Sequence, residues 1–386
     1  MSVISDHCDV KIGQSAPQDK SAFSDTGMPF VRAGSLEGLL AGESLDSLEQ
    51  INEDNAQKYK MKIFPKGSSL FPKSGMSAKI GRVYKLPKPA FVVSHLAGVI
   101  PNANIDQDYL FRWWEYKNPA TLISNDAYPS IKKSQIEAVP FYPPSLSEQK
   151  RIAAVLDQAD ALRQKRKQSI DYLNQLGQSI FYEMFGDPRT NPMNFQKIQF
   201  GKFADVKLGK MLDKGKKRGN LTKKYLRNAN VRWFSFDLAD LNEMEFYASE
   251  LDRFKVVKGD LLICEGGEPG RCAVWYNEDC DIFYQKALHR ARLDQSVAIP
   301  EYVSFWFFLA ANLSMLSDSV TSATIAHLTG QKIKKLEIMV PSLDLQSTFL
   351  KKLSCIEDRK QNFSTALTGA ETIFASLQQR AFRGEL

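Results

Sequence analysis

The pattern of hydrophobic and polar positions divides the chain into two kinds of segment. Short alternating or apolar runs, broken by glycine and proline, are typical of β strands and turns, and they fill residues 1–143 and 188–340. In 144–187 and 341–386, apolar residues instead recur at steps of three and four, which is the period of an amphipathic helix. The pattern predicts two β-rich domains, each followed by one long helix.

Each predicted helix carries one narrow apolar stripe, interrupted in the first helix by Arg166 and Ser169. The stripes are Ile152, Val155, Ala159, Leu162, Leu173, Leu176 and Ile180 in the first helix, and Phe349, Leu353, Ile356, Phe363, Ala366, Ala370, Ile373 and Leu377 in the second. Two matched stripes cover each other in an antiparallel coiled coil, although each helix could instead pack only on its own β-rich domain. A helix of about 35 residues is about 50 Å long. Paired helices of that length would hold the two β-rich domains apart by about the length of 15 base pairs of DNA.

The two halves of the chain repeat the same landmarks in the same order. VKIG at 10–13 returns as VKLG at 206–209, and PSL at 144–146 returns at 341–343. KGSSLF at 66–71, followed by Gly75 and Gly81, returns as KGDLLI at 258–263, followed by Gly267 and Gly270. Because the spacing is nearly constant, we infer an internal duplication. The predicted fold class is α+β: two β-rich domains separated by a pair of long antiparallel coiled-coil helices, with a pseudo-two-fold internal repeat.

Composition narrows the class of protein. The 386 residues are 43% hydrophobic, enough for two or three domains, and the formal net charge of +7 favours an anionic partner such as nucleic acid. Five scattered cysteines without C-x-x-C spacing predict neither a disulfide framework nor a zinc site. The first ten residues lack a secretory pattern, and the apolar stretch 302–316 is shorter than the ~20 residues of a membrane span. We therefore expect a cytoplasmic protein in which 302–316 forms a buried helix.

Basic residues gather at places that the repeat relates. Between 201 and 236, eleven Lys or Arg stand against two acidic residues, with KGKKRG at 214–219. A glycine-flanked basic loop is typical of a segment that follows phosphates and reads base edges, although a short charge run is also typical of a solvated loop. The candidate DNA-binding residues are Lys73, Ser74, Lys79, Arg82 and His95 in the first half, and Lys210, Lys214, Lys216, Lys217, Arg218, Arg271, Gln285 and Lys286 in the second.

Other polar and aromatic residues favour structural roles. His289 and Arg290 lie at roughly the place that matches His95, and a single histidine at a strand end is more often structural than a reader of bases. The tryptophans predicted to pack in the core are Trp113, Trp114, Trp233 and Trp306.

Motifs for catalysis do not emerge from the sequence. YPPS at 142–145 lacks the leading Asn or Asp of an amino-methyltransferase turn, and EGGEPG at 265–270 lacks the G-x-G-x-x-G spacing of a cofactor loop. Asp260 and Glu265 could form a nuclease carboxylate pair, but no lysine follows at the right place and Asp260 aligns with Ser68 of the first half. We therefore expect no enzymatic activity, no bound metal and no cofactor in this chain.

Two strings resemble a known family. PSLSEQKRI at 144–152, which opens a long helix after a β-rich domain, resembles the central helical region of type I restriction-modification specificity subunits. KGDLLI at 258–263 resembles a strand and turn of the family's target recognition domains, and the resemblance covers essentially the whole chain. One departure is that Leu345 stands where the first copy has Glu148, although Gln346 keeps the place of Gln149. The C-terminal region is therefore expected to contact its partner differently.

The resemblance implies an organisation and a set of partners. Target recognition domains are expected at 1–143 and 188–340, each reading one half of a split, asymmetric DNA site, with a central helix at 144–187 and a C-terminal helix at 341–386. The implied partners are double-stranded DNA, two modification subunits that bind S-adenosylmethionine and methylate adenine, and restriction subunits that use ATP and Mg²⁺. The candidate partner-binding residues are Glu148, Gln149, Arg151, Ile152 and Gln346. This chain would only recognise the DNA sequence, and its partners would carry out the reactions.

Three other hypotheses stay open at this point. The chain could be the specificity module of another restriction or phage-defence methyltransferase complex. It could be a coiled-coil scaffold that binds protein only, which predicts no salt-sensitive DNA affinity. It could also be a catalytic subunit that cleaves or methylates DNA by a route without a familiar motif.

Overall fold

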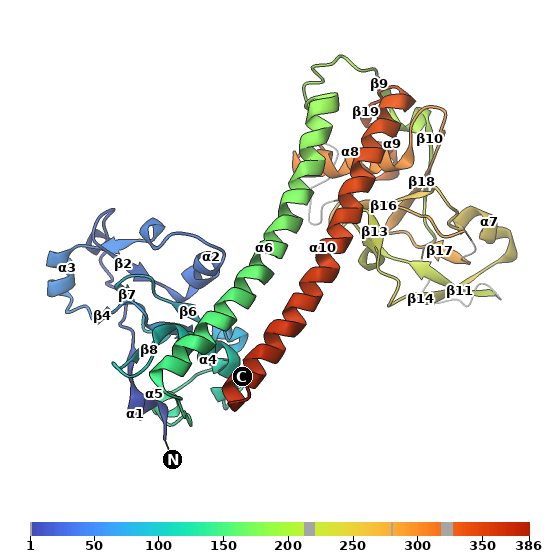
Figure 1. The fold of residues 1–386 in the computed structure, drawn as a ribbon. Helices are drawn as coiled ribbons and strands as arrows, with labels where there is room; N and C mark the ends of the chain where they lie inside the picture. The colour runs from blue at the N-terminus through green and yellow to red at the C-terminus, as the bar shows by residue number, and fades with distance from the viewer. Residues whose placement is uncertain (1, 212–220, 279–280, 318–326) are drawn as a thin grey trace. The chain divides into compact units, whose positions relative to one another are not determined.

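The computed structural model describes residues 2–211, 221–278, 281–317 and 327–386. Its longest elements are the helices α6 (Leu146–Phe185) and α10 (Leu343–Arg383), which occupy the segments predicted to be helical (Figure 1). The chain forms two compact units, and both helices contribute to each. Unit 1 contains Met1–Lys167 and Thr365–Leu386, and unit 2 contains Gln168–Ser364. Among the described residues, no helix is both long and apolar enough to cross a bilayer.

Unit 1 is built on two four-stranded sheets. The first is antiparallel, in the order β1 (Cys8–Ile12), β8 (Leu96–Pro101), β5 (Ser69–Pro72), β6 (Tyr84–Lys85). The second has the order β3 (Gln50–Ile51), β2 (Met28–Val31), β7 (Ala90–Val92), β4 (Ile63–Phe64), and its β2–β7 pair is parallel. The shorter helices are α1 (Ile4–His7), α2 (Leu36–Leu40), α3 (Glu53–Lys58), α4 (Gln107–Lys117) and α5 (Lys133–Glu137).

Unit 2 also has a four-stranded main sheet and a second sheet, with two short strand pairs in addition. Its main sheet has the order β10 (Ala204–Leu208), β18 (Leu288–Leu293), β15 (Leu261–Cys264), β16 (Cys272–Val274). A second sheet has the order β14 (Asn242–Phe246), β11 (Leu221–Leu226), β17 (Ile282–Tyr284), with β11–β17 parallel. Two strand pairs complete it: β12 (Val231–Arg232) with β13 (Ser235–Phe236), and β9 (Lys197–Gln199) with β19 (Glu337–Met339). The helices are α7 (Leu251–Phe254), α8 (Pro300–Asn312) and α9 (Gly330–Lys335).

The duplication seen in the sequence extends to the pairing of individual residues. The central strand β8 pairs Val99 with Val10 on one side and with Ser69 on the other, and its counterpart β18 pairs Ala291 with Val206 and with Leu261. The parallel pairs of the second sheets match as well, Phe30 with Phe91 and Tyr225 with Phe283. The predicted α+β fold with an internal two-fold repeat is therefore confirmed.

Glycines fix the hairpin that follows the third strand of each main sheet. Gly75 and Gly267 open the hairpin with φ of 77° and 75°, and Gly81 and Gly270 end it with φ of 70° and 91°. Residues with a Cβ atom rarely adopt these values, so the turn needs glycine at both points. The hairpin of unit 1 is longer because a 3₁₀ helix, Met76–Ile80, lies between its two glycines.

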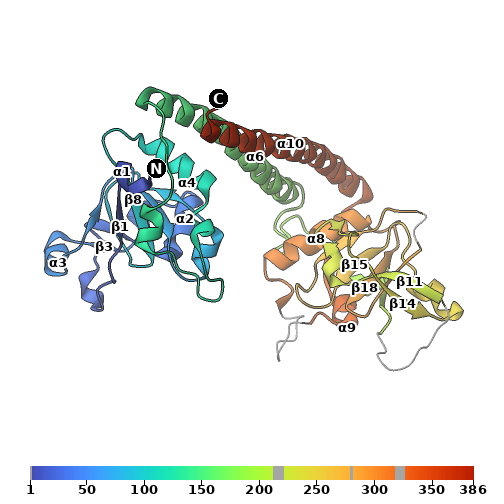
Figure 2. The same cartoon turned by 90° about the horizontal axis from the view of Figure 1, so that it is seen from below.

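One helix covers the main sheet in each unit. In unit 2, α8 lies against the sheet (Figure 2), and its residues Tyr302 and Trp306 share a core with Leu261 and Ile263. This is the buried helix predicted from the apolar stretch at 302–316. In unit 1, α4 has the same place, with Trp113 and Trp114 in the core. The fourth tryptophan, Trp233, is only partly buried, and its indole N–H donates to the carboxylate of Glu268 (2.7 Å).

The two long helices are antiparallel within each unit. In unit 1, Ile152 and Leu156 near the start of α6 share a core with Phe374 and Ala381 near the end of α10. In unit 2, Phe181 and Phe185 near the end of α6 pack on Phe349 near the start of α10, with ring centroids 5.5 and 5.4 Å apart. Each helix end also packs on its own unit, so the two predicted modes of packing occur together.

Only part of each predicted apolar stripe is covered. Leu162 and Leu176 of α6 are 57% and 45% exposed, and Ile373 of α10 is 60% exposed. The seam is polar where the stripe is interrupted, since the guanidinium of Arg166 donates to the carbonyl of Ala366. The predicted antiparallel pairing of the helices is therefore present, but these three apolar positions lie on the surface of the described chain.

A buried glutamine fixes the start of each long helix. The side-chain amide N–H of Gln149 donates to the carbonyls of Asn104 and Pro144, and its oxygen accepts from the backbone N–H of Asp106 (2.8 Å). The matching residue, Gln346, makes the same three contacts, with Val297, Pro341 and the N–H of Ile299 (2.8 Å). Since Asp106 and Ile299 are the N-caps of α4 and α8, each glutamine ties a long helix to the helix that covers the sheet.

Candidate nucleic-acid interface

Three loops far apart in the sequence meet at one edge of unit 1. The backbone N–H of Lys73 donates to the carbonyl of His95 (2.9 Å), and the carbonyl of Lys73 accepts from Ile131 (2.7 Å). The N–H of Gly75 donates to the carbonyl of Pro129 (3.0 Å). We call residues 73–82, 94–95 and 126–130 the loop edge of unit 1. All five candidate DNA-binding residues of the first half lie there.

Two of these bonds recur in unit 2, where a third bond joins another pair of loops. The N–H of Glu265 donates to the carbonyl of Ala287 (2.9 Å), and the carbonyl of Glu265 accepts from Leu328 (2.7 Å). The N–H of Lys286 donates to the carbonyl of Lys210 (2.8 Å). We call residues 265–271 and 285–287, with Lys210 and His327, the loop edge of unit 2. It contains the candidates Lys210, Arg271, Gln285 and Lys286, whereas Lys214, Lys216, Lys217 and Arg218 lie outside the described residues.

Several candidate cations are held by groups of their own unit. Arg271 forms an ion pair with Glu268 (2.7 Å) and donates to the carbonyl of Asn228 (3.1 Å). Lys210 forms an ion pair with Glu250 and lies over the ring of Phe246. Burial alone would raise the pKa of Glu250, but Lys210 outweighs it and holds that pKa below its usual range. These cations shape the edge more than they offer charge to a ligand.

Other candidates keep their polar groups available. In the described part of the chain, Lys73 and Lys286 form no ion pair within 4.0 Å. The exposed His95 shares a hydrogen bond with the hydroxyl of Ser74 (2.8 Å). Lys79 pairs with the very exposed Asp126 at 3.4 Å, a contact that water and salt weaken. Arg82 is intermediate, since it pairs with Glu37 at 3.1 Å on the surface.

Exposed apolar side chains distinguish the loop edge of unit 1. Met76 is 71% exposed, Ile80 is 56% exposed and Tyr128 is 81% exposed. Met76 and Ile80 lie in the inserted 3₁₀ helix, for which the shorter hairpin of unit 2 has no room. Large apolar side chains at a tip are suited to contact thymine methyl groups or to wedge between bases. Sequence reasoning missed these residues because exposure is not visible in a hydrophobic pattern.

Two residues that the sequence placed beside this edge lie elsewhere. His289 and Arg290 are 1% and 2% exposed, inside the central strand β18. The registers make Ala287, not His289, the counterpart of His95, because Glu265 pairs with Ala287 as Lys73 pairs with His95. Both side chains are therefore unavailable to a ligand.

The partner-binding candidates divide in the same way. Gln149, Gln346 and Ile152 are 1%, 0% and 3% exposed, so the structure gives them an internal role in place of the surface role expected from the resemblance. Glu148 and Arg151 are on the surface, where Arg151 donates two hydrogen bonds to the carboxylate of Glu148 (2.9 and 2.7 Å). That ion pair lowers the pKa of Glu148.

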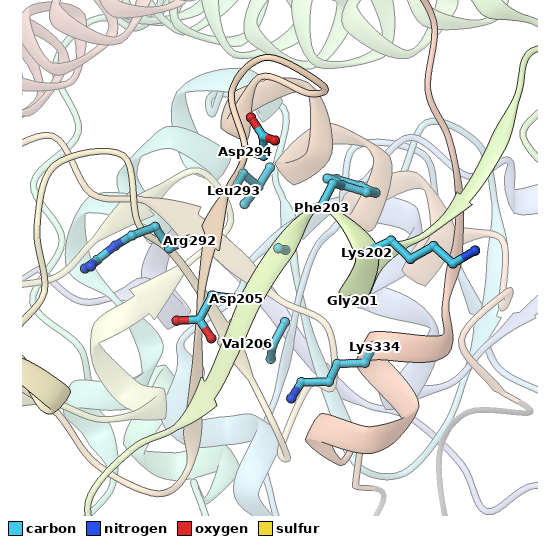
Figure 3. A pocket seen from close by; sticks show the side chains of 10 residues that line it. Gly201, Lys202, Phe203, Asp205, Val206, Arg292, Leu293, Asp294 and Lys334 are labelled. Carbon is cyan, nitrogen blue, oxygen red and sulfur yellow. The ribbon is translucent and has the colours of Figure 1, made fainter.

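A surface hollow of about 410 Å³ lies beside the edge strand β10 of unit 2 (Figure 3). The side chains of Lys202 and Arg292 on its rim point to opposite sides. Arg292 is already bound to the buried carboxylate of Asp260 by two hydrogen bonds (2.8 and 2.9 Å). The polar groups do not converge on one point, so the hollow offers no ligand site. The same contacts give Asp260 a structural role, in agreement with its alignment to Ser68.

Metal ligands and disulfides do not add to the picture. Within the described ranges, no group of three His, Cys, Asp or Glu side chains is placed to hold a metal ion. The described cysteines are free thiols: Cys8, Cys264 and Cys272 are buried, and Cys355 is exposed. What the two loop edges can do chemically is donate and accept hydrogen bonds and attract an anion.

Comparison with known proteins identifies the family. A family model described as "Type I restriction modification DNA specificity domain" matches residues 1–172 and again residues 192–366. The chain belongs to this family. The two matched segments correspond to the two halves of the structural repeat.

Curated relatives agree with this assignment. The chain is 23% identical over 393 residues to the type I restriction enzyme EcoKI specificity subunit of Escherichia coli K12, covering 94% of this chain and 83% of the relative. It is 33% identical over 132 residues to the type I restriction enzyme MjaIX specificity subunit of Methanocaldococcus jannaschii, covering 33% of this chain and 30% of the relative.

Solved structures share the fold. The S subunit of a type I restriction-modification system from M. genitalium aligns with a TM-score of 0.54 at 14% identity, over 99% of this chain and 95% of that one. A chain from a study of assembly and conformational transition of the type I restriction-modification system aligns with a TM-score of 0.62 at 15% identity, over 100% and 97%. At these identities the likeness concerns the fold.

Proposed function

We propose that this chain is the DNA specificity subunit of a type I restriction-modification complex, in which each unit reads one half of a bipartite, asymmetric site. The observation that carries the proposal is that one scaffold occurs twice with different chemistry at its loop edge. Two copies of one scaffold suit two half-sites. Different side chains on the two edges suit half-sites of different sequence.

The loop edges supply both kinds of contact that sequence-specific DNA binding needs. A free ammonium group such as that of Lys286 attracts phosphates and fixes the position on the duplex. Hydroxyl, imidazole and carboxylate groups such as those of Ser74, His95 and Glu265 suit base edges. A hairpin loop on a rigid sheet presents these groups in a fixed arrangement.

The long helices are proposed to dock two modification subunits. Their exposed apolar side chains support a protein partner, since large apolar groups are unfavourable in water. These side chains are Leu162, Tyr172 and Leu176 on α6, and Phe363 and Ile373 on α10. The surface pair formed by Glu148 and Arg151 is the polar candidate for the same interface.

Catalysis is proposed to belong to the partners. The modification subunits would bind S-adenosylmethionine and methylate adenine, and restriction subunits would use ATP and Mg²⁺. This chain would bind no cofactor and carry out no chemistry. Its place of action would be the cytoplasm, where the host DNA lies.

Methylation by the complex tests the proposal. The chain is purified with its modification subunit, and modified DNA from a random duplex library is sequenced. We expect one split motif containing adenine, and an affinity that falls steeply with salt as counterions are released. The chain alone, given S-adenosylmethionine, should methylate nothing.

Other outcomes identify the rival functions. Methylation without sequence preference would contradict the proposal. DNA affinity that is absent at every salt concentration would favour a scaffold that binds only protein. Methyl transfer or DNA cleavage by the isolated chain would favour a catalytic subunit. A split motif from a complex that does not cleave unmodified DNA even when its restriction subunits and ATP are added would place the chain in another methyltransferase complex of phage defence.

A further inference from the structure

Glu265 and Lys73 occupy the same position in the two units. Each donates its backbone N–H to the turn before the central strand, to Ala287 and His95 respectively, at 2.9 Å in both units. Each accepts at its carbonyl from the segment that leads to the next helix, from Leu328 and Ile131, at 2.7 Å in both units. Backbone bonds on both sides hold the two Cα atoms in equivalent places, so only the side chains differ.

Both side chains have polar groups without a partner. Several carboxylates near this edge are bound: Glu250 by Lys210, Glu268 by Arg271 and Trp233, Asp260 by Arg292. The carboxylate of Glu265, in contrast, makes no hydrogen bond or ion pair with any described residue. The ammonium group of Lys73 is equally free within the described part of unit 1.

The surroundings of Glu265 are unusual for a free surface carboxylate. It is half-buried, and burial raises its pKa, whereas the charges of His327 and Lys286 act to lower that pKa. A negative group at this edge would repel DNA phosphates, so it does not serve general attraction to the duplex. Its place among cations suggests a more selective contact.

The two side chains have opposite hydrogen-bonding chemistry. An ionised carboxylate only accepts hydrogen bonds, and an ammonium group only donates them. In the major groove, cytosine N4 and adenine N6 are the donors, whereas guanine O6 and N7 are acceptors. A Lys in one unit and a Glu at the same place in the other therefore match different bases.

We propose that Glu265 and Lys73 are matched specificity-determining residues, with Glu265 accepting from the exocyclic amino group of a cytosine or adenine in one half-site and Lys73 donating to a guanine in the other. This inference rests on the proposed DNA-reading function and adds which residues discriminate, and against which base chemistry. The loss of one such contact relaxes discrimination at one base pair and leaves the other half-site unchanged.

The test uses the complex of this chain with its modification subunit and a library of random duplexes. Glu265→Gln removes the charge and adds an amide donor at nearly constant shape. We expect discrimination to fall about tenfold or more at one base pair of one half-site. Lys73→Met should do the same at one base pair of the other half-site. Glu265→Asp, which keeps the carboxylate on a shorter side chain, should keep the preferred base with weaker discrimination.

The matched control is Glu278→Gln. Glu278 is an exposed glutamate paired with Lys258, at the end of the β15–β16 hairpin opposite to Glu265. We expect the complex with Glu278→Gln to methylate the same motif as the unchanged complex. Thermal unfolding of each variant checks that the fold is intact, and Glu265→Asp answers the question if the glutamine variant does not fold.

The possible results distinguish failure of the proposed function from failure of the role assigned to Glu265. If the unchanged complex yields no split motif, the proposed function fails. If it yields one and Glu265→Gln leaves every position as selective as before, the function stands and the role of Glu265 is refuted. A loss of affinity that is uniform over all sequences also refutes it, because a base-reading residue acts at its own base pair.

Discussion

The two units meet the long helices through the same backbone arrangement but with different side chains. Arg112 and Phe305 both lie six residues after the N-cap that receives the glutamine of the long helix. In unit 1 this position carries a buried guanidinium, and in unit 2 it carries an aromatic ring. Comparing the two junctions shows which contacts the fold requires and which side chains differ between the two copies.

The junction in unit 1 is a charged network. Arg112, 6% exposed, donates to Glu115 of its own helix and to Asp157 and Asp160 of α6, at 2.8 to 3.0 Å. Burial alone would lower the pKa of Arg112, but the carboxylates outweigh burial and raise it. For Glu115 burial is the larger influence and raises the pKa above its usual range in spite of Arg112. The ring of Phe374 on α10 lies 5.7 Å from the guanidinium.

The junction in unit 2 is an aromatic cluster. The ring of Phe305 lies 5.1 Å from that of Phe349 and 5.7 Å from that of Phe181. Where unit 1 has Phe374, the repeat places Gly177, and an added Cβ there would lie 3.7 Å from Phe305. In unit 1 the ring of Phe374 on the long helix faces Arg112. In unit 2 the long helix has Gly177 at this place, and it faces the ring of Phe305. The difference shows that the fold needs the space between the two helices to be filled and needs the hydrogen bonds of Gln149 or Gln346 beside it. It does not need one particular side chain there.

The aromatic junction should be the more sensitive one. Phe349→Ala removes a fully buried ring from a cluster of five, and we expect unit 2 to lose about 4 kcal/mol because a cavity remains. The matched change in unit 1 is Ile152→Ala, which removes a smaller side chain and should cost about 3 kcal/mol. Peptide-resolved hydrogen exchange measures each unit separately. Equal losses would contradict the view that unit 2 depends on its aromatic cluster.

The charged junction should respond to pH. Arg112→Ala leaves Glu115 and Asp157 without their counterion, whereas Asp160 keeps its ion pair with Arg163. We expect a loss of about 2 to 3 kcal/mol near pH 8, since water reaches the carboxylates in part. Glu115 already has a raised pKa, so its ionised form opposes folding, and losing Arg112 raises the pKa further. The loss should therefore shrink at pH 5, where Glu115 takes up a proton more readily.

Hydrogen exchange of unit 1, corrected for the intrinsic rate at each pH, measures this effect. Arg112→Lys is the control, because it keeps the charge without the three-way hydrogen bonding and should lose less stability. A loss that is the same at pH 5 and pH 8 would show that packing of the arginine, not its charge, stabilises the junction.

The smallest expected effect concerns acid stability of unit 2 alone. His289 is buried, and burial lowers its pKa from 6.5 to about 4, although the backbone of Leu328 acts to raise it. A lowered histidine pKa gives stability that is complete above pH 6.5 and is lost as the pH falls toward 4. At pH 5 the loss should reach about 2 kcal/mol.

His289→Ala should abolish this acid sensitivity, because alanine is what the repeat places there in unit 1, at Ala97. Urea unfolding at pH 7 and pH 5 compares the variant with the unchanged protein. If the variant loses as much stability on acidification as the unchanged protein, another group is responsible and the prediction is wrong.

The repeat and its turns could be predicted from the sequence because their causes are local. Gly75 and Gly267 mark positions where φ is positive, and the requirement for glycine shows in the string itself. The long helices are visible for the same reason, since apolar residues recur at steps of three and four from 152 to 180, with one polar interruption, and from 349 to 377.

The candidate site was predicted less completely. The sequence identifies its loops and all of its Lys and Arg residues, but it offers Glu265 only as part of a nuclease pair. Aligning the repeat at Lys73 would have singled it out. Arg82 and Arg271 appeared as free charges in the sequence, yet Glu37 and Glu268 pair with them. Gln149 was assigned to a surface that it does not reach.

By itself the sequence determined the duplication, the strand and helix periods and the glycine turns, because each depends on backbone preferences over a few neighbouring residues. Only the tertiary structure decided which polar groups are free. Hydrogen-bond partners come from segments tens of residues away, as Asp106 does for Gln149 and Glu250 does for Lys210. Because a charge is useful to a ligand only when its own chain has not already neutralised it, the reading chemistry of this protein follows from contacts that no local pattern records.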